Sequence, residues 1–210
     1  MKKINICNSG LLASEISLGI MRMNALTHEE ATVVIRTAVD NGIDYFDHAD
    51  IYGRGTSEEI FGKAFKELGI ARDSVMLQTK CVMFDFSKEH IIASVEGSLK
   101  RLQTDYVDAL LLHRPDTLVE PEEVAEAFDE LHKAGKVRHF GVSNQNPMQI
   151  ELLKKAATQP LLINQLQLSL THAPMIDAGF NVNMMNNPSF MHDGSVLEYS
   201  RISDMTIQPW

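Results

Sequence analysis

The stretch YVDALLLHRPDTLVEPEEVAEAFDELHKAGKVRHFGV, residues 106–142, contains a strand, a helix and a second strand in succession. Its two ends, Tyr106 to Leu112 and Val137 to Val142, are short apolar runs of the kind that form buried strands. Between them an apolar stripe at helical spacing is formed by Val124, Phe128 and Leu131. Pro121 precedes the stripe, at a position where a first helical turn tolerates a missing N–H. The stretch therefore predicts two parallel strands joined by a helix.

The same alternation continues in both directions from this stretch. We expect parallel strands at Leu18 to Met21, Ile43 to Phe46, Val75 to Thr79, Tyr106 to Leu112, Val137 to Val142, Leu162 to Gln165 and Met205 to Gln208. Strands that alternate with amphipathic helices predict a parallel sheet covered by helices. Two of the helices are expected to begin with capping boxes, Thr27 with Glu30 and Thr56 with Glu59.

Two segments do not follow the alternation. Near the N-terminus, Ile4 to Cys7 and Ile16 to Leu18 flank the turn-forming residues 8–10 (NSG), which predicts a β-hairpin or tight turn ahead of the first parallel strand. After the sixth strand, Thr171 to Gly194 shows no clear periodicity, and we expect a long functional loop there.

Seven expected strands are one fewer than an eight-stranded β/α barrel contains, and such barrels take about 250 residues. The predicted fold is an incomplete TIM-type (β/α)8 barrel with an N-terminal hairpin, formed by residues 1–210 as a single domain. We expect the eighth strand and the last helices to be missing. The first and seventh strands would then expose their edges.

Composition excludes several classes of protein. The formal net charge is −9, whereas nucleic-acid binders use clustered basic residues to neutralise phosphates. No stretch approaches the ~18 apolar residues of a membrane span. The two cysteines, Cys7 and Cys81, lie far apart, which favours neither a disulfide framework nor a zinc site. We therefore expect a cytoplasmic protein with no nucleic-acid or membrane partner.

Polar and aromatic side chains follow the expected strands, at the ends where the chemistry of β/α barrels collects. They are Asp47, His48, Asp50 and Tyr52 after the second strand, Lys80 after the third, His113 after the fourth, Ser143 and Asn144 after the fifth, Gln165 at the end of the sixth and Trp210 after the seventh. Since the carboxyl ends of parallel strands lie at one rim, we expect these groups to meet there.

At these residues the sequence resembles the aldo-keto reductase superfamily, in particular its bacterial group of predicted oxidoreductases. The resemblance is carried by FDHADIYG (residues 46–53) with Glu58 and residues 62–64, by DYVDALLLHRPD (residues 105–116) and by GKVRHFGVSN (residues 135–144). It implies a nicotinamide-dependent enzyme that reduces a small aldehyde or ketone.

The resemblance assigns the catalytic tetrad to Asp47, Tyr52, Lys80 and His113. Carbonyl reduction needs a proton at the oxygen where negative charge develops. Tyr52 would supply it, although a free phenol has a pKa of about 10. A nearby Lys80 ammonium would lower that pKa, Asp47 would hold the ammonium, and His113 would orient the substrate oxygen.

The resemblance also implies an NADPH or NADP cofactor. Ser143, Asn144 and Gln165 would hold the nicotinamide carboxamide, and Trp210 would stack on the ring. The other expected cofactor contacts are Gly19, Met21 and Arg22. Because the family places its phosphate contacts after the seventh and eighth strands, we expect these 210 residues to bind NADPH weakly or not at all. The oligomeric state is not predicted.

Three other interpretations fit parts of this pattern. His48 and Asp50 with His113 resemble part of a metal-dependent hydrolase site, but later strands supply no further ligands, and no metal is expected. Gly53 and Gly55 resemble the start of a dinucleotide loop, but the third glycine is missing. The last alternative is a non-catalytic or regulatory nicotinamide-binding module, because the resemblance extends to potassium-channel β subunits; the complete tetrad favours the enzyme.

Overall fold

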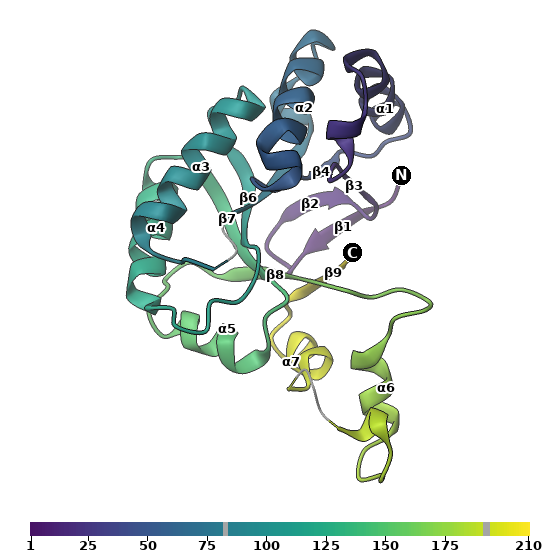
Figure 1. Cartoon of the computed structure of the whole chain (residues 1–210), viewed down its shortest axis with the longest axis vertical. Helices are drawn as coiled ribbons and strands as arrows, with labels where there is room; N and C mark the ends of the chain where they lie inside the picture. Colours follow the sequence, from purple (N-terminus) through teal and green to yellow (C-terminus); the bar gives the residue numbers. More distant parts are fainter. Residues whose placement is uncertain (82–83, 191–193) are drawn as a thin grey trace.

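A curled parallel sheet with helices on its outer face forms the body of the protein (Figure 1). The structure is a computed structural model and describes residues 1–81, 84–190 and 194–210. Within these ranges seven parallel strands pair in chain order: β3 (Ser17–Gly19), β4 (Tyr45–Asp47), β5 (Met76–Cys81), β6 (Val107–Leu112), β7 (Val137–Ser143), β8 (Leu161–Leu166) and β9 (Thr206–Pro209). The seven predicted strands are thereby confirmed, with bounds that shift by at most two residues.

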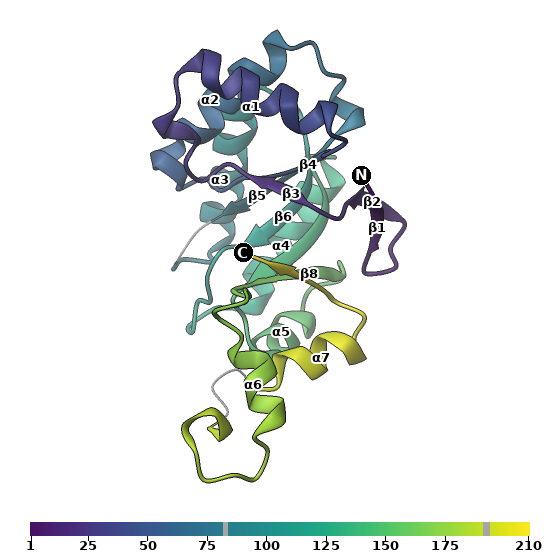
Figure 2. The ribbon, with the colours of Figure 1, turned by 90° about the vertical axis from the view of Figure 1, so that its right-hand side faces the viewer.

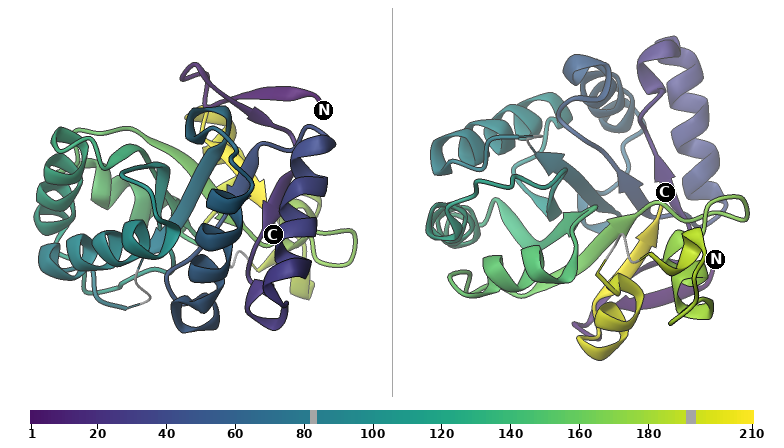
Figure 3. Two further views of the ribbon diagram at one scale, coloured as in Figure 1. Left: turned by 90° about the horizontal axis from the view of Figure 1, so that it is seen from above. Right: turned by 60° about the horizontal axis from the view of Figure 1, so that its bottom comes forward.

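The two edges of this sheet belong to β3 and β9, and the described residues include no strand that pairs with both. The sheet curls far enough to bring its first and last strands to the same side of the molecule (Figure 3). The fold is therefore an incomplete (β/α)8 barrel, as the sequence predicts.

Most of the helices cover the outer face of the sheet, whereas α6 extends away from it (Figure 2). Their bounds are α1 (His28–Asp40), α2 (Thr56–Glu67), α3 (Lys88–Leu102), α4 (Pro121–Lys133), α5 (Pro147–Lys154), α6 (Pro174–Phe180) and α7 (Val196–Ile202). The apolar stripe of α4 is fully buried, as expected for a helix that packs on a sheet. No helix among the described residues is long and apolar enough to cross a membrane.

The two predicted capping boxes have different outcomes. At α1 the box is confirmed, because the Thr27 hydroxyl accepts from the N–H of Glu30 and the Glu30 carboxylate accepts from the N–H of Thr27. At α2 the prediction is wrong. The N-cap there is Gly55, with φ 90°, and no side chain caps the helix. Thr56 already has helical dihedral angles, whereas a capping side chain needs the extended backbone that Thr27 has.

An antiparallel hairpin of β1 (Lys3–Ile6) and β2 (Leu11–Ser14) precedes the barrel, which confirms the predicted hairpin. Its second arm differs from the prediction of Ile16 to Leu18, because Leu18 belongs to β3. The hairpin packs against the amino ends of the barrel strands, where an apolar cluster includes Ile6, Ala13, Tyr45, Met76, Leu162 and Ile163. The N–H of Cys7 also donates to Thr206 Oγ1, at 2.8 Å.

The segment predicted as a long loop, Thr171 to Gly194, contains regular structure. Pro174 begins α6, and a 3-10 turn, η4, covers Asn187–Ser189. Residues 191–193 lie outside the described part of the chain. A seven-residue helix offers too few turns for a periodic pattern, so this part of the prediction is wrong in its secondary structure.

Candidate active site

The carboxyl ends of the strands surround a cavity of about 650 Å³. Its walls include three of the four predicted catalytic residues, Asp47, Tyr52 and His113. All seven predicted cofactor contacts also line it: Gly19, Met21, Arg22, Ser143, Asn144, Gln165 and Trp210. The structure thus brings together residues that lie up to 191 positions apart in the sequence.

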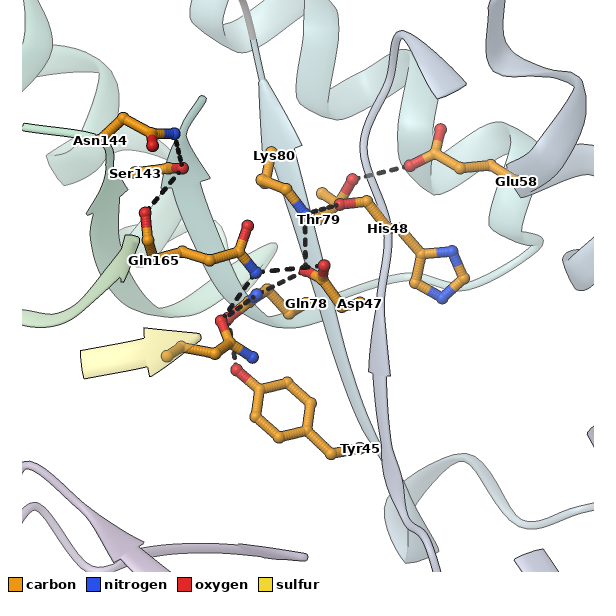
Figure 4. A network of polar contacts seen from close by, with 11 residues as sticks. Tyr45, Asp47, His48, Glu58, Gln78, Thr79, Lys80, Ser143, Asn144 and Gln165 are labelled. Atoms are coloured by element: carbon orange, nitrogen blue, oxygen red, sulfur yellow. Dashed lines mark hydrogen bonds and ion pairs between the residues drawn. The ribbon is translucent and has the colours of Figure 1, made fainter. Parts of the chain in front are cut away.

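Lys80 does not line this cavity but contacts Asp47, which does, and it is 1% exposed. Its ammonium donates to Asp47 Oδ1 at 2.6 Å and to the backbone carbonyl oxygen of His48 at 2.8 Å (Figure 4). Both partners come from the end of β4, the strand that pairs with β5. Taking an ammonium out of water is costly unless it is paired and hydrogen-bonded, and the two contacts supply both conditions.

A layer of side-chain amides below Asp47 fixes the orientation of its carboxylate (Figure 4). Gln78 Nε2 donates to Asp47 Oδ1 at 2.6 Å, and Gln165 Nε2 donates to Asp47 Oδ2 at 3.1 Å. Gln208 Oε1 accepts from both of these amides at 2.9 Å. Both carboxylate oxygens are therefore engaged, which leaves Asp47 one arrangement.

Three members of this network are not among the residues predicted from the sequence: Gln78, Gln208 and Tyr45, whose hydroxyl donates to Gln78 Oε1. A signal for two of them exists in the strand period. Gln78 lies two positions before Lys80, and Tyr45 lies two positions before Asp47, so each shares the inner face of its strand with a predicted catalytic residue. Burial, helped by the negative charge of Asp47, raises the pKa of Tyr45 well above its usual value, and its phenol stays neutral.

Tyr52 reaches the cavity from η2 (Tyr52–Gly55), the tight turn between β4 and α2. The turn requires a φ of 57° at Gly53 and 90° at Gly55, values that glycine adopts without strain. The Lys80 ammonium lies 5.1 Å from the centre of the Tyr52 ring. The His113 ring meets the same ring edge-on, with 5.9 Å between the ring centres.

The Lys80 ammonium lowers the pKa of Tyr52 as expected, but the net pKa of Tyr52 needs correction. Burial raises the pKa of Tyr52 above 10, and the nearby Lys80 ammonium offsets that rise only in part. The net direction is therefore opposite to the one expected, because desolvation of the phenolate outweighs the attraction of the cation. Tyr52 is a neutral phenol at pH 7, which is the form that can donate a proton.

His113 is also held in its neutral form. Burial, followed by repulsion from the Lys80 ammonium, lowers the pKa of His113 to about 4. Its Nδ1 is buried without a hydrogen-bond partner among the described residues. A neutral imidazole at the cavity wall carries one N–H, which is able to donate to an oxygen atom in the cavity.

The residues of the metal-site alternative do not meet. The His48 imidazole points away from the Asp47 carboxylate, on the outer side of β4 (Figure 4), and packs edge-on against Phe61 with 4.4 Å between the ring centres. Asp50 faces α3, where its carboxylate accepts from the Ser94 hydroxyl. In the described parts of the chain no group of three or more His, Cys, Asp or Glu side chains is arranged to hold a metal ion.

The opposite wall of the cavity is formed by amide and hydroxyl groups. Asn144 Nδ2 donates to Ser143 Oγ at 2.8 Å, and Ser143 Oγ donates to the carbonyl oxygen of Gln165 at 3.1 Å. Trp210 Nε1 approaches Asn144 Oδ1 at 3.4 Å. These contacts tie the side chains of Ser143 and Asn144 to the backbone of β8 and to Trp210, and they leave the Gln165 side-chain oxygen available to accept a hydrogen bond.

Three other residues line the cavity and were not assigned from the sequence: Ile51, Gly53 and Arg114. Arg114 follows His113 directly, so the position of His113 after a strand was a signal for it. The Arg114 guanidinium carbon lies 5.7 Å from the centre of the Trp210 ring.

Two residues that follow the FDHADIYG motif, Glu58 and Gly62, do not line the cavity and have structural contacts. Glu58 is fully buried and accepts from Thr79 Oγ1 and from Arg101 Nε, each at 2.7 Å. A Cβ atom on Gly62 would lie 2.4 Å from the carbonyl oxygen of Arg101. These two residues thus let α2 pack closely against α3 and β5.

Comparison with known proteins agrees with this geometry. The family model described as Aldo/keto reductase family matches residues 15–184. The chain is 40% identical over 199 residues to the uncharacterized oxidoreductase YcsN of Bacillus subtilis. The aligned region covers 87% of this chain and 66% of YcsN. The chain is also 37% identical over 190 residues to the oxidoreductase YdhF of Escherichia coli. This aligned region covers 84% of this chain and 64% of YdhF. The chain therefore spans slightly less than two thirds of the length of these two relatives.

A similar solved structure is an aldo/keto reductase from Klebsiella pneumoniae in complex with NADP and acetate. The two structures superpose with a TM-score of 0.80 at 26% sequence identity, over 100% of this chain and 67% of that one. The curled parallel sheet of this chain is thus a large part of a known barrel.

Proposed function

The chain belongs to the aldo/keto reductase family, and we propose on that premise that it reduces an aldehyde or a ketone to an alcohol with NADPH. The single observation that carries the proposal is the buried Lys80 and Asp47 pair beside a cavity whose wall contains Tyr52 and His113. In this proposal Lys80 is a cation, Asp47 is its fixed counter-ion, Tyr52 is a proton donor and His113 is a neutral hydrogen-bond donor. Together they match the demands of a carbonyl oxygen that gains negative charge.

Tyr52 is the proposed proton donor. Its pKa lies above 10, so the phenol keeps its proton at pH 7 until a stronger base, the developing alkoxide, approaches it. The phenolate that results would face the Lys80 ammonium, which stabilises it. His113 would donate a hydrogen bond to the same oxygen and orient it. Asp47, held by Gln78 and Gln165, keeps the ammonium in position.

The cavity fits a nicotinamide cofactor. Its amide wall offers Ser143, Asn144 and Gln165 to a carboxamide, and Trp210 presents an aromatic face. Gly19, Met21 and Arg22 form the remaining side. NADP or NADPH is the proposed form, supported by the NADP in the Klebsiella pneumoniae structure. When bound, the cofactor supplies the hydride, and the residues named here bind and orient it.

Residues 1–210 are proposed to act as one domain. One apolar cluster runs from Ile35 of α1 to Leu153 of α5 and continues to Met205, so the two ends of the chain share a core. A protein with two independent units would have separate cores.

The test is reduction of a reactive aldehyde followed by NADPH absorbance, with Tyr52→Phe as the variant. We expect the variant to lose at least a hundredfold in kcat, the usual contribution of a positioned acid, while its Kd for NADPH stays within twofold. Tyr199→Phe is the matched control, because Tyr199 lies on α7 and contacts Glu151 away from the cavity.

Two results would contradict the proposal. Equal activity of Tyr52→Phe and the unaltered chain would remove the role of Tyr52. Binding of NADPH without turnover of any aldehyde would favour the non-catalytic nicotinamide-binding module instead. A full-length relative with the same substitution serves as a parallel measurement if this chain binds NADPH weakly.

A further inference from the structure

The proposed active site carries a positive charge that the catalytic scheme does not use. Asp47 is the single carboxylate among the described residues that line the cavity, and its charge is balanced by Lys80. Arg22 and Arg114 line the same cavity. The described residues contain no carboxylate in an ion pair with either arginine. The cavity is therefore cationic within a chain whose formal net charge is −9.

Three arginines that do not line the cavity are in ion pairs with buried carboxylates. Arg72 and Arg138 both contact the Asp108 carboxylate, and Arg101 contacts Glu58. An arginine that faces a cavity without such a partner is open to an anion that enters the cavity.

Arg114 lies beside the proposed proton donor. It follows His113 directly in the loop after β6, and its guanidinium lies 5.7 Å from the Trp210 ring centre. Its positive charge lowers the pKa of both Tyr52 and His113, although burial determines the net direction for each. A group bound to this guanidinium would therefore lie close to the carbonyl that Tyr52 protonates.

We propose that Arg114 binds a carboxylate of the substrate, so that the preferred substrates are anionic carbonyl compounds, such as oxo acids and formyl acids. The proposal rests on the proposed function, because it names the substrate class of the same site. A guanidinium presents two parallel N–H groups that match the two oxygens of a carboxylate. The cationic cavity also attracts anions toward its mouth.

The same chemistry would suit a phosphate of NADPH. The two sources predict different effects of Arg114→Gln. If Arg114 holds the cofactor, the variant raises the Kd for NADPH and treats charged and neutral substrates alike. If it holds the substrate, the variant loses its preference for charged substrates.

The first experiment measures binding without turnover. Trp210 is the only tryptophan of the chain, so its fluorescence reports on the group next to Arg114. Benzoate and the neutral, nearly isosteric benzamide are titrated into the full chain. We expect saturable binding of benzoate that is at least tenfold tighter than that of benzamide. Arg114→Gln should weaken benzoate binding at least tenfold, and Arg114→Lys should restore part of it.

Arg36→Gln is the matched control, because Arg36 is an exposed arginine of α1 that does not line the cavity. This control should bind benzoate as the unaltered chain does. Equal affinity for benzoate and benzamide, or benzoate binding that Arg114→Gln leaves intact, would overturn the proposal.

The second experiment compares 4-formylbenzoate with its methyl ester as substrates, with NADPH. We expect the ratio of the two kcat/KM values to fall at least tenfold in Arg114→Gln, mainly through KM for the carboxylate. An unchanged ratio, or a raised Kd for NADPH as the main effect, would overturn the assignment to the substrate. If neither aldehyde is reduced, the proposed function fails, and the fluorescence titration still decides whether Arg114 is an anion site.

Discussion

The Lys80 ammonium lies 2.6 Å from Asp47 Oδ1 inside the curled sheet, and the Lys80 side chain is almost completely buried. A buried ion pair is costly to break from one side, because the remaining charge has neither water nor a partner. The pair therefore couples the proposed chemistry to the stability of the fold. Asp47→Asn should lower the free energy of unfolding by about 3 kcal/mol, measured by urea denaturation.

The matched control for this pair is the exposed ion pair between Lys133 and Asp129 on α4. Lys133→Met should leave the urea midpoint unchanged, since exposed pairs contribute little. If Asp47→Asn is as stable as the unaltered chain, water must reach Lys80, and the buried pair described above does not hold in solution.

Stability should depend on pH through His113. Its folded pKa is about 4, below the ordinary value of 6.5, mainly because burial disfavours the imidazolium. Between pH 6.5 and pH 4 the unfolded chain therefore binds a proton that the folded chain does not. The free energy of unfolding contributed by neutral His113 is present above pH 6.5 and falls by up to about 3 kcal/mol as the pH drops to 4.

His113→Gln removes this contribution, so its unfolding free energy should change less between pH 7.5 and pH 4.5 than that of the unaltered chain. Burial lowers the pKa of His48 and of His139 as well, so some pH dependence should remain in the variant. Identical pH profiles for the two proteins would show that His113 titrates near its ordinary pKa.

Helix α2 should not tolerate a side chain at Gly62. A Cβ atom there would meet backbone atoms of Arg101 and Leu102 at 2.4 to 3.0 Å, and backbone cannot move aside as a flexible side chain can. Gly62→Ala should therefore lower the free energy of unfolding by about 1 to 3 kcal/mol, although alanine is the better helix former.

Gly179→Ala in α6 is the matched substitution, because the nearest atom to its new Cβ is Glu198 Oε1 at 3.6 Å. It should be neutral or raise the free energy of unfolding by up to about 1 kcal/mol. Thermal or urea denaturation of both variants compares the two sites. A stabilised Gly62→Ala would mean that α2 and α3 lie farther apart than described.

The two threonines at helix starts should differ. Thr27→Ala removes a capping hydroxyl and should cost about 1 kcal/mol of stability. Thr56→Ala should change it by no more than a few tenths of a kcal/mol, since Thr56 caps nothing. Urea denaturation of the two variants tests this contrast, and equal losses would show that Thr56 does cap α2.

The sequence predicts the parallel strands well because each is a short apolar run bounded by turn residues, as at β6. It predicts the polar rim because parallel strands end at one edge, so Asp47, Lys80 and His113 had to lie near one another. The capping box at α2 fails because the TSEE pattern is present while the preceding turn, with its positive φ at Gly55, determines where the helix begins.

The features of the site that the sequence does not predict depend on contacts between strands that are distant in the sequence. The amide layer joins Gln78 of β5 to Gln208 of β9, which are 130 positions apart, and no local pattern indicates that contact. The net direction of the Tyr52 pKa cannot be predicted from the sequence for the same kind of reason. It depends on the balance between burial and the nearby Lys80 ammonium, and burial is known only from the folded chain. Arg114 shares the positional signal of His113, because both follow β6, but a single arginine after a strand is most often an exposed cation and is therefore not predicted as a site residue.

The hairpin that packs beneath the barrel would give proton movement in the proposed reaction a direction. Its side chains Ile6 and Ala13 form, with Tyr45 and Met76, an apolar floor under the amide layer. In the proposed reaction, a proton that Tyr52 gives up would therefore be replaced from the mouth of the barrel. Exchange of protons with bulk water would run along the same open face that admits the ligands, so a bound ligand would shield Tyr52 from solvent while it reacts.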